Sequence, residues 1–337
     1  MVRSFNPSRS RLALLTAVAV LACVGDGRAM QETGSRLEGV FLSATVTDAS
    51  GRPVLDLESS DFVILEGGEP VVIERFESPD VPVNVAFVAD TSPGAVFGVE
   101  WTRRELTKML AGLAPDHLAE VFEAQTEVVL LVELTSDREE LDRAIESLQA
   151  TGNPTNRIFD ATSSALVTLL EGGTARSAVI VLTDGIDVGS NRTEAAFDRV
   201  ARLAGLPIYV IAIDNVDGFS GNLGASVSGL PFGNTTRARI ADLAKQMEVM
   251  YYQRQDFWRQ LAERSGGELF DTADEDDFSE IYDEIGSRLS GMYSFYYYSD
   301  RNSNDSDWVP IEVHVNRPGS QVHAPAGIQF LEDDESN

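Results

Sequence analysis

The sequence has few of the side chains that usually cross-link a small protein or hold a transition metal. Its 337 residues include one cysteine, Cys23, and three histidines. A lone cysteine excludes an intramolecular disulfide. The scattered His117, His314 and His323 match none of the spacings of a zinc site. Stability must therefore come from buried cores.

Long apolar runs are also absent after the first residues, since no later stretch approaches about 18 uninterrupted apolar positions. The start of the chain differs. Arg3, Arg9 and Arg11 are followed by an uncharged apolar run from Leu12 to Val24. That run is short for a bilayer span but suits a signal peptide, which we expect over residues 1–29. The mature protein is then extracytoplasmic: secreted, periplasmic or attached to the envelope.

Cys23 leaves two interpretations of this segment open. It ends the run Val20-Leu21-Ala22-Cys23, which resembles the lipid-acceptor position of bacterial lipoproteins, although Leu21 stands one place away from the usual order. Lipid attachment at Cys23 would give the protein its one membrane contact. In the other interpretation cleavage follows Ala29, and Cys23 is discarded with the signal peptide.

Basic residues are scarce, and this constrains the partners. The chain has 54 acidic residues against 26 lysines and arginines, a formal net charge of −28. Such a charge repels phosphate backbones and anionic membrane surfaces, which argues against nucleic-acid binding. Divalent cations and basic protein patches are better matched to it.

Hydrophobic patterning divides the chain into a centre and two flanks. Residues 39–80 and 292–330 show short alternating runs between turns, including Gly67-Gly68 as the turn of a hairpin in FVILEGGEPVVIERFE. We expect these flanks to form the two parts of one small antiparallel β-sandwich, followed by an acidic tail at 331–337. Two separate satellite hairpins are the alternative.

Residues 81–291 alternate buried strands with helices, which predicts a doubly wound α/β domain inserted in that sandwich. Strands are expected at 81–90, at 177–183, at 206–214, at 267–270 and in two runs between 120 and 133. Helices are expected at about 95–114, 137–148, 158–170, 193–204, 236–264 and 276–290.

Oxygen-bearing side chains follow the ends of the buried strands of this domain. Asp90 and Ser92 end the first strand, Asp184 follows 177–183, and Thr155 precedes the helix at 158. Ligands of doubly wound sheets bind at the carboxyl ends of the strands. Carboxylates and hydroxyls without histidine or cysteine describe a site for a hard cation such as Mg²⁺, which retains several waters.

The runs VAFVADTS, RIFDA and VIVLTDG together resemble the von Willebrand factor A (VWFA) domain and its metal-ion-dependent adhesion site. The flanking segments resemble those of VWFA-related proteins of the acidobacterial type, so the likeness spans nearly the whole mature chain. It implies a Rossmann-like α/β fold, and an adhesion-type module that binds a protein partner through Mg²⁺ or another divalent cation. By resemblance, Asp90, Ser92, Thr155 and Asp184 are the metal ligands.

The chain departs from that family pattern at two ligand positions. Gly94 stands where the family has a second serine, and it has no side-chain oxygen. Thr155 precedes Asp160 by five residues where the family has four, so strict spacing would place Asn156 there, as a weaker oxygen ligand. The site is therefore partly degraded, and a relic without metal is an open alternative.

A stretch rich in glycine, serine and asparagine between Asn215 and Thr235 leaves the same edge of the sheet and carries Phe219, Leu223 and Phe232. Long loops in compact domains are usually functional or disordered. We regard these apolar residues as candidate partner contacts, with a disordered insertion as the alternative.

Two classes of function follow. The first is a non-catalytic module that binds an acidic residue of an unidentified protein through the cation. The second is a structural or scaffold protein of the envelope that needs no metal, as Gly94 suggests. A hydrolase is disfavoured because no histidine lies near Asp90 in the sequence to serve as a general base.

Overall fold

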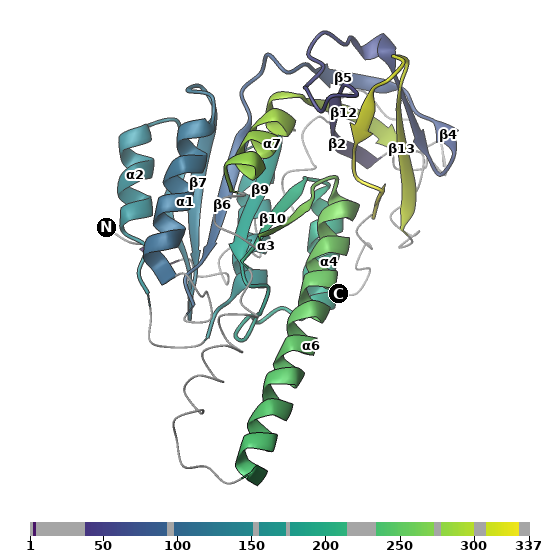
Figure 1. Ribbon diagram of the computed structural model, residues 1–337. Coiled ribbons are helices and arrows are strands. Elements are labelled where there is room, and N and C mark those ends of the chain that lie inside the picture. The colour runs from purple at the N-terminus through teal and green to yellow at the C-terminus, as the bar shows by residue number, and fades with distance from the viewer. Residues whose placement is uncertain are drawn as a thin grey trace, which may run out of the picture.

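The computed structural model describes residues 3–4, 38–92, 98–150, 155–172, 176–213, 234–272, 278–299 and 308–329 (Figure 1). Several predicted features lie outside these residues: Cys23, Gly94, and the loop that carries Phe219, Leu223 and Phe232. No helix in the described part is both long and apolar enough to cross a membrane.

A seven-stranded sheet forms the centre of the larger domain. Its order is β1 (Arg3–Ser4), β8 (Val128–Thr135), β7 (Leu118–Ala124), β6 (Asn84–Asp90), β9 (Ser177–Thr183), β10 (Ile208–Ile213) and β11 (Leu269–Thr272). β8 is antiparallel to β7 and β1 to β8, while the remaining neighbours are parallel. Without β1, the strands follow the order 3-2-1-4-5-6 of doubly wound folds. The predicted fold class is confirmed.

Every residue of β6, β9 and β10 is buried, as their continuous apolar sequences predict for parallel strands covered on both faces. The core on one face includes α1 (Gly98–Gly112), α2 (Arg138–Glu146) and α7 (Phe278–Ser290). The core on the other includes α3 (Ile158–Glu171), α4 (Glu194–Ala204) and α6 (Asn234–Ser265). In Figure 1 the first part of α6 extends beyond the rest of the domain.

Two four-stranded antiparallel sheets form the β-sandwich. One sheet has the order β14 (Gln321–His323), β2 (Glu38–Thr47), β12 (Met292–Ser299) and β5 (Ile73–Glu77). The other has the order β15 (Gly327–Ile328), β13 (Val309–Val315), β3 (Phe62–Glu66) and β4 (Glu69–Pro70). β12 pairs with β2 and β13 pairs with β3, so strands from both flanks share both sheets. The predicted pairing of the two flanks is confirmed.

The hairpin predicted around Gly67-Gly68 is shorter than its alternating sequence suggests. Only Glu69–Pro70 pairs with β3, and Ile73–Glu77 joins β12 in the opposite sheet. One further backbone bond, from the N–H of Val71 to the carbonyl of Ile64 at 3.0 Å, follows Pro70 before the chain crosses to the other sheet.

Buried Arg176 fixes the two crossings between the sandwich and the α/β domain. Its side chain is fully buried, and its guanidinium donates to the carbonyl oxygens of Pro79, before β6, and Leu289, at the end of α7. Burial lowers the pKa of Arg176 to about 10, so it remains a cation at neutral pH. One buried charge thus ties together both connections between the domains.

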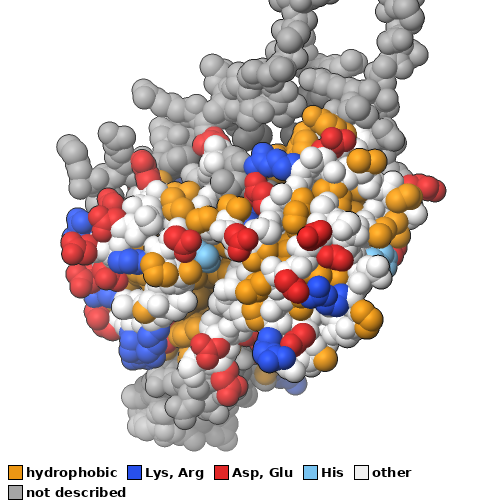
Figure 2. Space-filling model, turned by 90° about the horizontal axis from the view of Figure 1, so that it is seen from above, with side chains coloured by type: hydrophobic (Ala, Val, Ile, Leu, Met, Phe, Trp, Pro, Cys, Tyr) orange, Lys and Arg blue, Asp and Glu red, His pale blue; other side chains and the backbone are white. Residues whose placement is uncertain are grey.

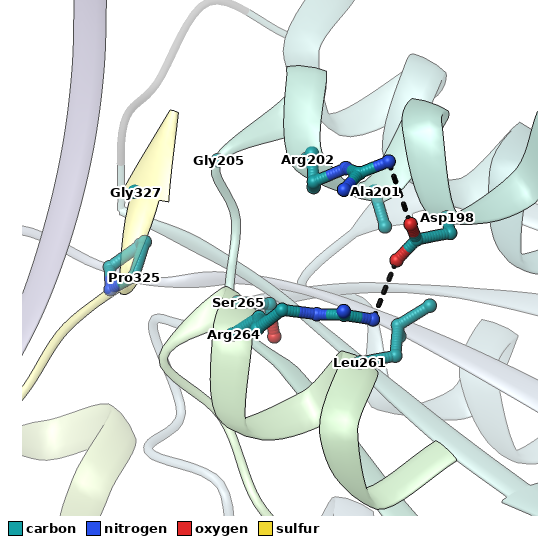
Figure 3. A pocket seen from close by; sticks show the side chains of 9 residues that line it. All are labelled: Asp198, Ala201, Arg202, Gly205, Leu261, Arg264, Ser265, Pro325 and Gly327. Carbon is teal, nitrogen blue, oxygen red and sulfur yellow. Dashed lines mark hydrogen bonds and ion pairs between the residues drawn. The ribbon is translucent and has the colours of Figure 1, made fainter. Parts of the chain in front are cut away.

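The seam between the domains is closely packed where α4 and α6 meet β15. A cavity of about 10 Å³ lies there, about the size of one water molecule. Asp198 lies between Arg202 and Arg264 beside it (Figure 3), and the backbone N–H of Ala326 donates to the carbonyl of Arg264. This part of the seam therefore has a structural role.

Glu120 on β7 is an acidic side chain that is buried in the central sheet. It is 3% exposed and accepts a hydrogen bond from Thr168 Oγ1 of α3 at 2.6 Å. Burial raises its pKa from 4.5 to about 7, and Glu133 adds to the rise. Ionised Glu120 therefore destabilises the fold progressively as the pH rises from 4.5 through 7.

Glu120→Gln should remove this penalty while keeping an oxygen that accepts from Thr168. We expect the free energy of unfolding to rise at pH 8 by up to about 3 kcal/mol, at about 1.36 kcal/mol per pKa unit. At pH 4 we expect little difference, because the glutamate is protonated in both states. Urea denaturation at the two pH values measures this, and an equal gain at both would contradict it.

Candidate functional site

The sheet topology places a switch point between the carboxyl ends of β6 and β9. These two strands pair in parallel, with Ala89 opposite Leu182, and the chain leaves them toward opposite sides of the sheet. Such a switch point is where doubly wound sheets bind ligands. β6 ends at Asp90 and β9 at Thr183, so the edge predicted from the sequence coincides with the topological switch point.

Asp90 is fully buried at this point, and its hydrogen bonds come from neutral groups. Its Oδ1 accepts from the backbone N–H of Ser92, and its Oδ2 accepts from Asn156 Nδ2 and Thr183 Oγ1, each at 2.9 Å. Burial raises the pKa of Asp90, while these hydrogen bonds oppose the rise. Within the described residues no lysine or arginine hydrogen-bonds to it. A buried carboxylate without a cationic partner is costly.

The other predicted ligands lie in or beside this network. Ser92 and Asp184 are buried, and Asp184 Oδ1 accepts from the N–H of Ile186 at 2.9 Å. Thr155 is half-buried and directly precedes Asn156. Its methyl carbon is in close contact with Gly189, where an added Cβ would lie 2.3 Å from it. Gly189 therefore allows the segment carrying Thr155 to approach the loop after β9.

Asn156, the alternative ligand under strict motif spacing, uses both ends of its amide in hydrogen bonds. Its Nδ2 donates to Asp90 Oδ2 and to the carbonyl of Ile186, while its Oδ1 accepts from the N–H of Val188 at 3.0 Å. The carbonyl partner needs a donor and the N–H partner needs an acceptor, so the amide orientation is fixed. Asn156 is therefore a strap that joins three segments of the edge, and Thr155 remains the candidate ligand.

The loop after β9 is held rigidly against the start of α3. Asp187 Oδ2 accepts from the N–H of Phe159 at 3.1 Å and also binds the hydroxyl of Ser190. An acceptor at a helix N-terminus satisfies an otherwise unpaired N–H group and favours negative charge. These bonds between the loop and α3 therefore help to position Thr155, which lies just before the helix.

Asp160 reinforces the same connection. Burial alone would raise its pKa, but hydrogen bonds from Asn191, Arg157 and Arg192 outweigh burial and hold the pKa below its usual value. Two guanidinium groups share this carboxylate, at 2.6 Å from Arg157 and 3.1 Å from Arg192. In the sequence, Asp160 was only the reference point for the spacing of Thr155.

Glu123 is a buried residue of this edge that the sequence analysis did not single out. It lies opposite Ala89 in the register, and its Oε1 accepts from Thr91 Oγ1 at 3.1 Å and from the N–H of Gln149 at 2.7 Å. It thereby holds the Asp90–Ser92 turn from the α1 and α2 side of the sheet. A glutamate near the carboxyl end of a buried strand was the available signal.

The chemistry of the edge fits a hard cation with few protein ligands. Asp90, Ser92, Thr155 and Asp184 supply only oxygen, as Mg²⁺ requires. The described residues contain no group of three or more histidine, cysteine or acidic side chains suited to holding a metal. A cation here would therefore retain water or take an oxygen from a partner.

The three histidines all lie away from this edge. His117 precedes β7, and so lies toward the opposite end of the parallel strands. His314 and His323 belong to β13 and β14 of the sandwich. Ser92 therefore has no histidine in position to activate it as a nucleophile.

Comparisons with known proteins give matches among solved structures alone. No protein-family model and no curated protein matches the chain. A von Willebrand factor type A protein from Catenulispora acidiphila is 10% identical, with a TM-score of 0.44, over 90% of this chain and 76% of that one. The SpRpn10 VWA domain is 16% identical, with a TM-score of 0.33, over 39% of this chain and 75% of that one.

A third structure is proximal thread matrix protein 1 from the mussel byssus, with a zinc-occupied MIDAS motif. It is 16% identical, with a TM-score of 0.44, and the match covers 65% of this chain and 48% of that one, about half its length. At these identities the likeness concerns the fold alone. The strand order is the direct evidence for the predicted doubly wound α/β fold.

Asn156→Ala tests whether the strap holds the edge together. The substitution removes a donor to Asp90 and leaves the Ile186 carbonyl and the Val188 N–H without their partner. We expect a loss of roughly 2–4 kcal/mol in the free energy of unfolding, measured by urea denaturation.

Asn191→Ala is the matched control, because Asn191 is exposed and bonds to Asp160 through its backbone N–H. We expect this control to change stability by no more than about 0.5 kcal/mol. Equal effects of the two substitutions would contradict the role assigned to Asn156.

Proposed function

We propose that the chain is a non-catalytic protein-binding module of the VWFA-related type that binds its partner through a divalent cation at the Asp90–Asp184 edge. The observation that carries this proposal is Asp90. Its carboxylate is fully buried at the switch point of the sheet and, among the described residues, is bonded by neutral donors only. A bound cation would compensate that charge.

Each candidate ligand has a separate role in this proposal. Asp90 and Asp184 supply negative charge, and the hydroxyls of Ser92 and Thr155 supply neutral oxygens. The bound cation would attract a carboxylate oxygen of the partner into its remaining coordination position. The chain's own residues hold the geometry: Asn156 fixes Thr155 beside Asp90, and Glu123 fixes the turn that carries Ser92.

The rim of the edge offers further contact with a partner. Val188 is 59% exposed, in the loop that Asn156 and Asp187 hold in place. Next to this loop, Arg157 and Arg192 both form ion pairs with Asp160. The side chain of Arg192 is 38% exposed. An exposed apolar side chain near guanidinium groups suits an acidic partner segment that carries an apolar residue.

Figure 2 shows the end of the molecule that lies opposite the cation edge. Figure 2 shows acidic and basic side chains mixed with hydrophobic ones, and acidic groups gather at the side where α2 lies.

We place the partner at the cation edge, and we propose that the protein acts outside the cytoplasm. The basic and then apolar start, expected to be a signal peptide, supports this, either with cleavage after Ala29 or with lipid attachment at Cys23.

A second candidate function, a scaffold protein that needs no metal, is favoured by one observation. Both oxygens of Asp90 already accept hydrogen bonds from Ser92, Asn156 and Thr183, so the network is complete without a cation. Gly94 also removes one oxygen of the family motif. In this case the same edge is a rigid, metal-free interaction surface.

Thermal melting with and without Mg²⁺ separates the two candidates. For the cation-binding module we expect the ion to stabilise the wild type by about 2.7 kcal/mol at a concentration one hundred times its dissociation constant. Asp184→Ala should abolish that gain, because it removes a ligand. Gly94→Ser should increase it by restoring the missing oxygen. Asp142→Ala, on the exposed side of α2, is the control and should respond like the wild type.

The outcomes are distinct. If the wild type does not respond to Mg²⁺, Mn²⁺ or Ca²⁺ and Gly94→Ser does, the site is a relic and the scaffold function stands. If Asp184→Ala responds as the wild type does, the assignment of Asp184 as a ligand is wrong.

A further inference from the structure

Gln255 on α6 is a polar side chain that is buried in the fold. It is 5% exposed, and both Oε1 and Nε2 are buried without a hydrogen-bond partner among the residues that the structure describes. A buried amide that makes no hydrogen bonds costs roughly 1–3 kcal/mol, and such groups in native proteins call for a specific explanation. An apolar side chain of the same length would avoid this cost.

The neighbours of Gln255 place it beside the cation edge. Trp258, three residues later, donates from Nε1 to the carbonyl of Gly185 at 3.1 Å. Arg254 also borders this turn, since its Cβ lies 3.6 Å from where a Cβ on Gly185 would be. Gly185 directly follows the candidate ligand Asp184.

The direction of α6 shows how far along the strands of the sheet Gln255 lies. Ser265, the last residue of α6, accepts a hydrogen bond from the N–H of Ile208 at the start of β10, whereas Trp258 contacts the turn after β9. The helix therefore runs antiparallel to the strands, and earlier residues lie closer to their carboxyl ends. Residues three apart lie on one side of a helix, so Gln255 is about one turn beyond Trp258 toward that edge.

We propose that Gln255 is a further residue of the cation site, and that it contacts the ion through a bound water. Its Oε1 accepts from a water in the ion's shell, and its Nε2 donates to the carboxylate that the partner presents. This inference rests on the proposed function. It follows from the small number of protein ligands, because Mg²⁺ with few of them retains waters that need acceptors.

Gln255→Met, which keeps the length and removes the polar atoms, distinguishes a residue of the cation site from a purely structural one by its affinity for Mg²⁺. In both cases the ion-free variant should melt at a higher temperature than the wild type, since the unpaired amide is gone. If Gln255 belongs to the site, the same variant should bind Mg²⁺ about ten times more weakly, the usual lower limit for loss of a residue that supports a metal site indirectly. A structural residue would leave the affinity unchanged.

The experiment titrates Mg²⁺ alone into the full chain and follows the melting temperature of the wild type, Gln255→Met and Gln260→Met. Gln260 is exposed on the same helix and serves as the matched control. The expected result is higher ion-free stability with weaker Mg²⁺ binding for Gln255→Met alone. A wild-type response that Gln255→Met retains in full overturns this inference and leaves the proposed function intact. Absence of any wild-type response overturns both.

Discussion

The burial of the Asp90 carboxylate is the constraint on which the arrangement of the edge depends. A charge with no contact with water must be neutralised by a proton, a cation or surrounding donors. Here Ser92, Asn156 and Thr183 supply donors from three segments that are distant in sequence. Asp90 therefore draws these three segments together, and Asp187, Asp160 and Glu123 hold them from outside this network.

The rest of the fold gives this group its fixed surroundings. The apolar strands β6 and β9 bring Asp90 and Asp184 to the same edge, and the strand order places the switch point of the sheet there. The sandwich lies at the other end of the strands, where buried Arg176 secures both crossings. This architecture leaves the carboxyl edge and the projecting part of α6 free of the sandwich (Figure 1).

Features that depend on local periodicity were predictable from the sequence. The helix expected at 236–264 is observed as Asn234–Ser265, and the buried strand at 177–183 is observed unchanged. The residues beside Asp90 were predictable as a group because each follows a strand or precedes a helix. The role of Asn156 was not, because the orientation of an amide depends on Ile186 and Val188, thirty residues away. Gln255 could not be predicted either, because the free-energy cost of its amide comes from its burial, and the helical sequence around it is polar.

The central claim is that one divalent cation binds between β6 and β9. A crystal structure of the full chain grown with Mn²⁺ tests it most directly, because the anomalous signal of manganese locates the ion independently of its ligands. We predict a single strong peak at this edge, at coordination distance from oxygens of Asp90, Ser92, Thr155 and Asp184. A map with no peak at this edge, while Asp90 keeps its hydrogen bonds to Asn156 and Thr183, would contradict it.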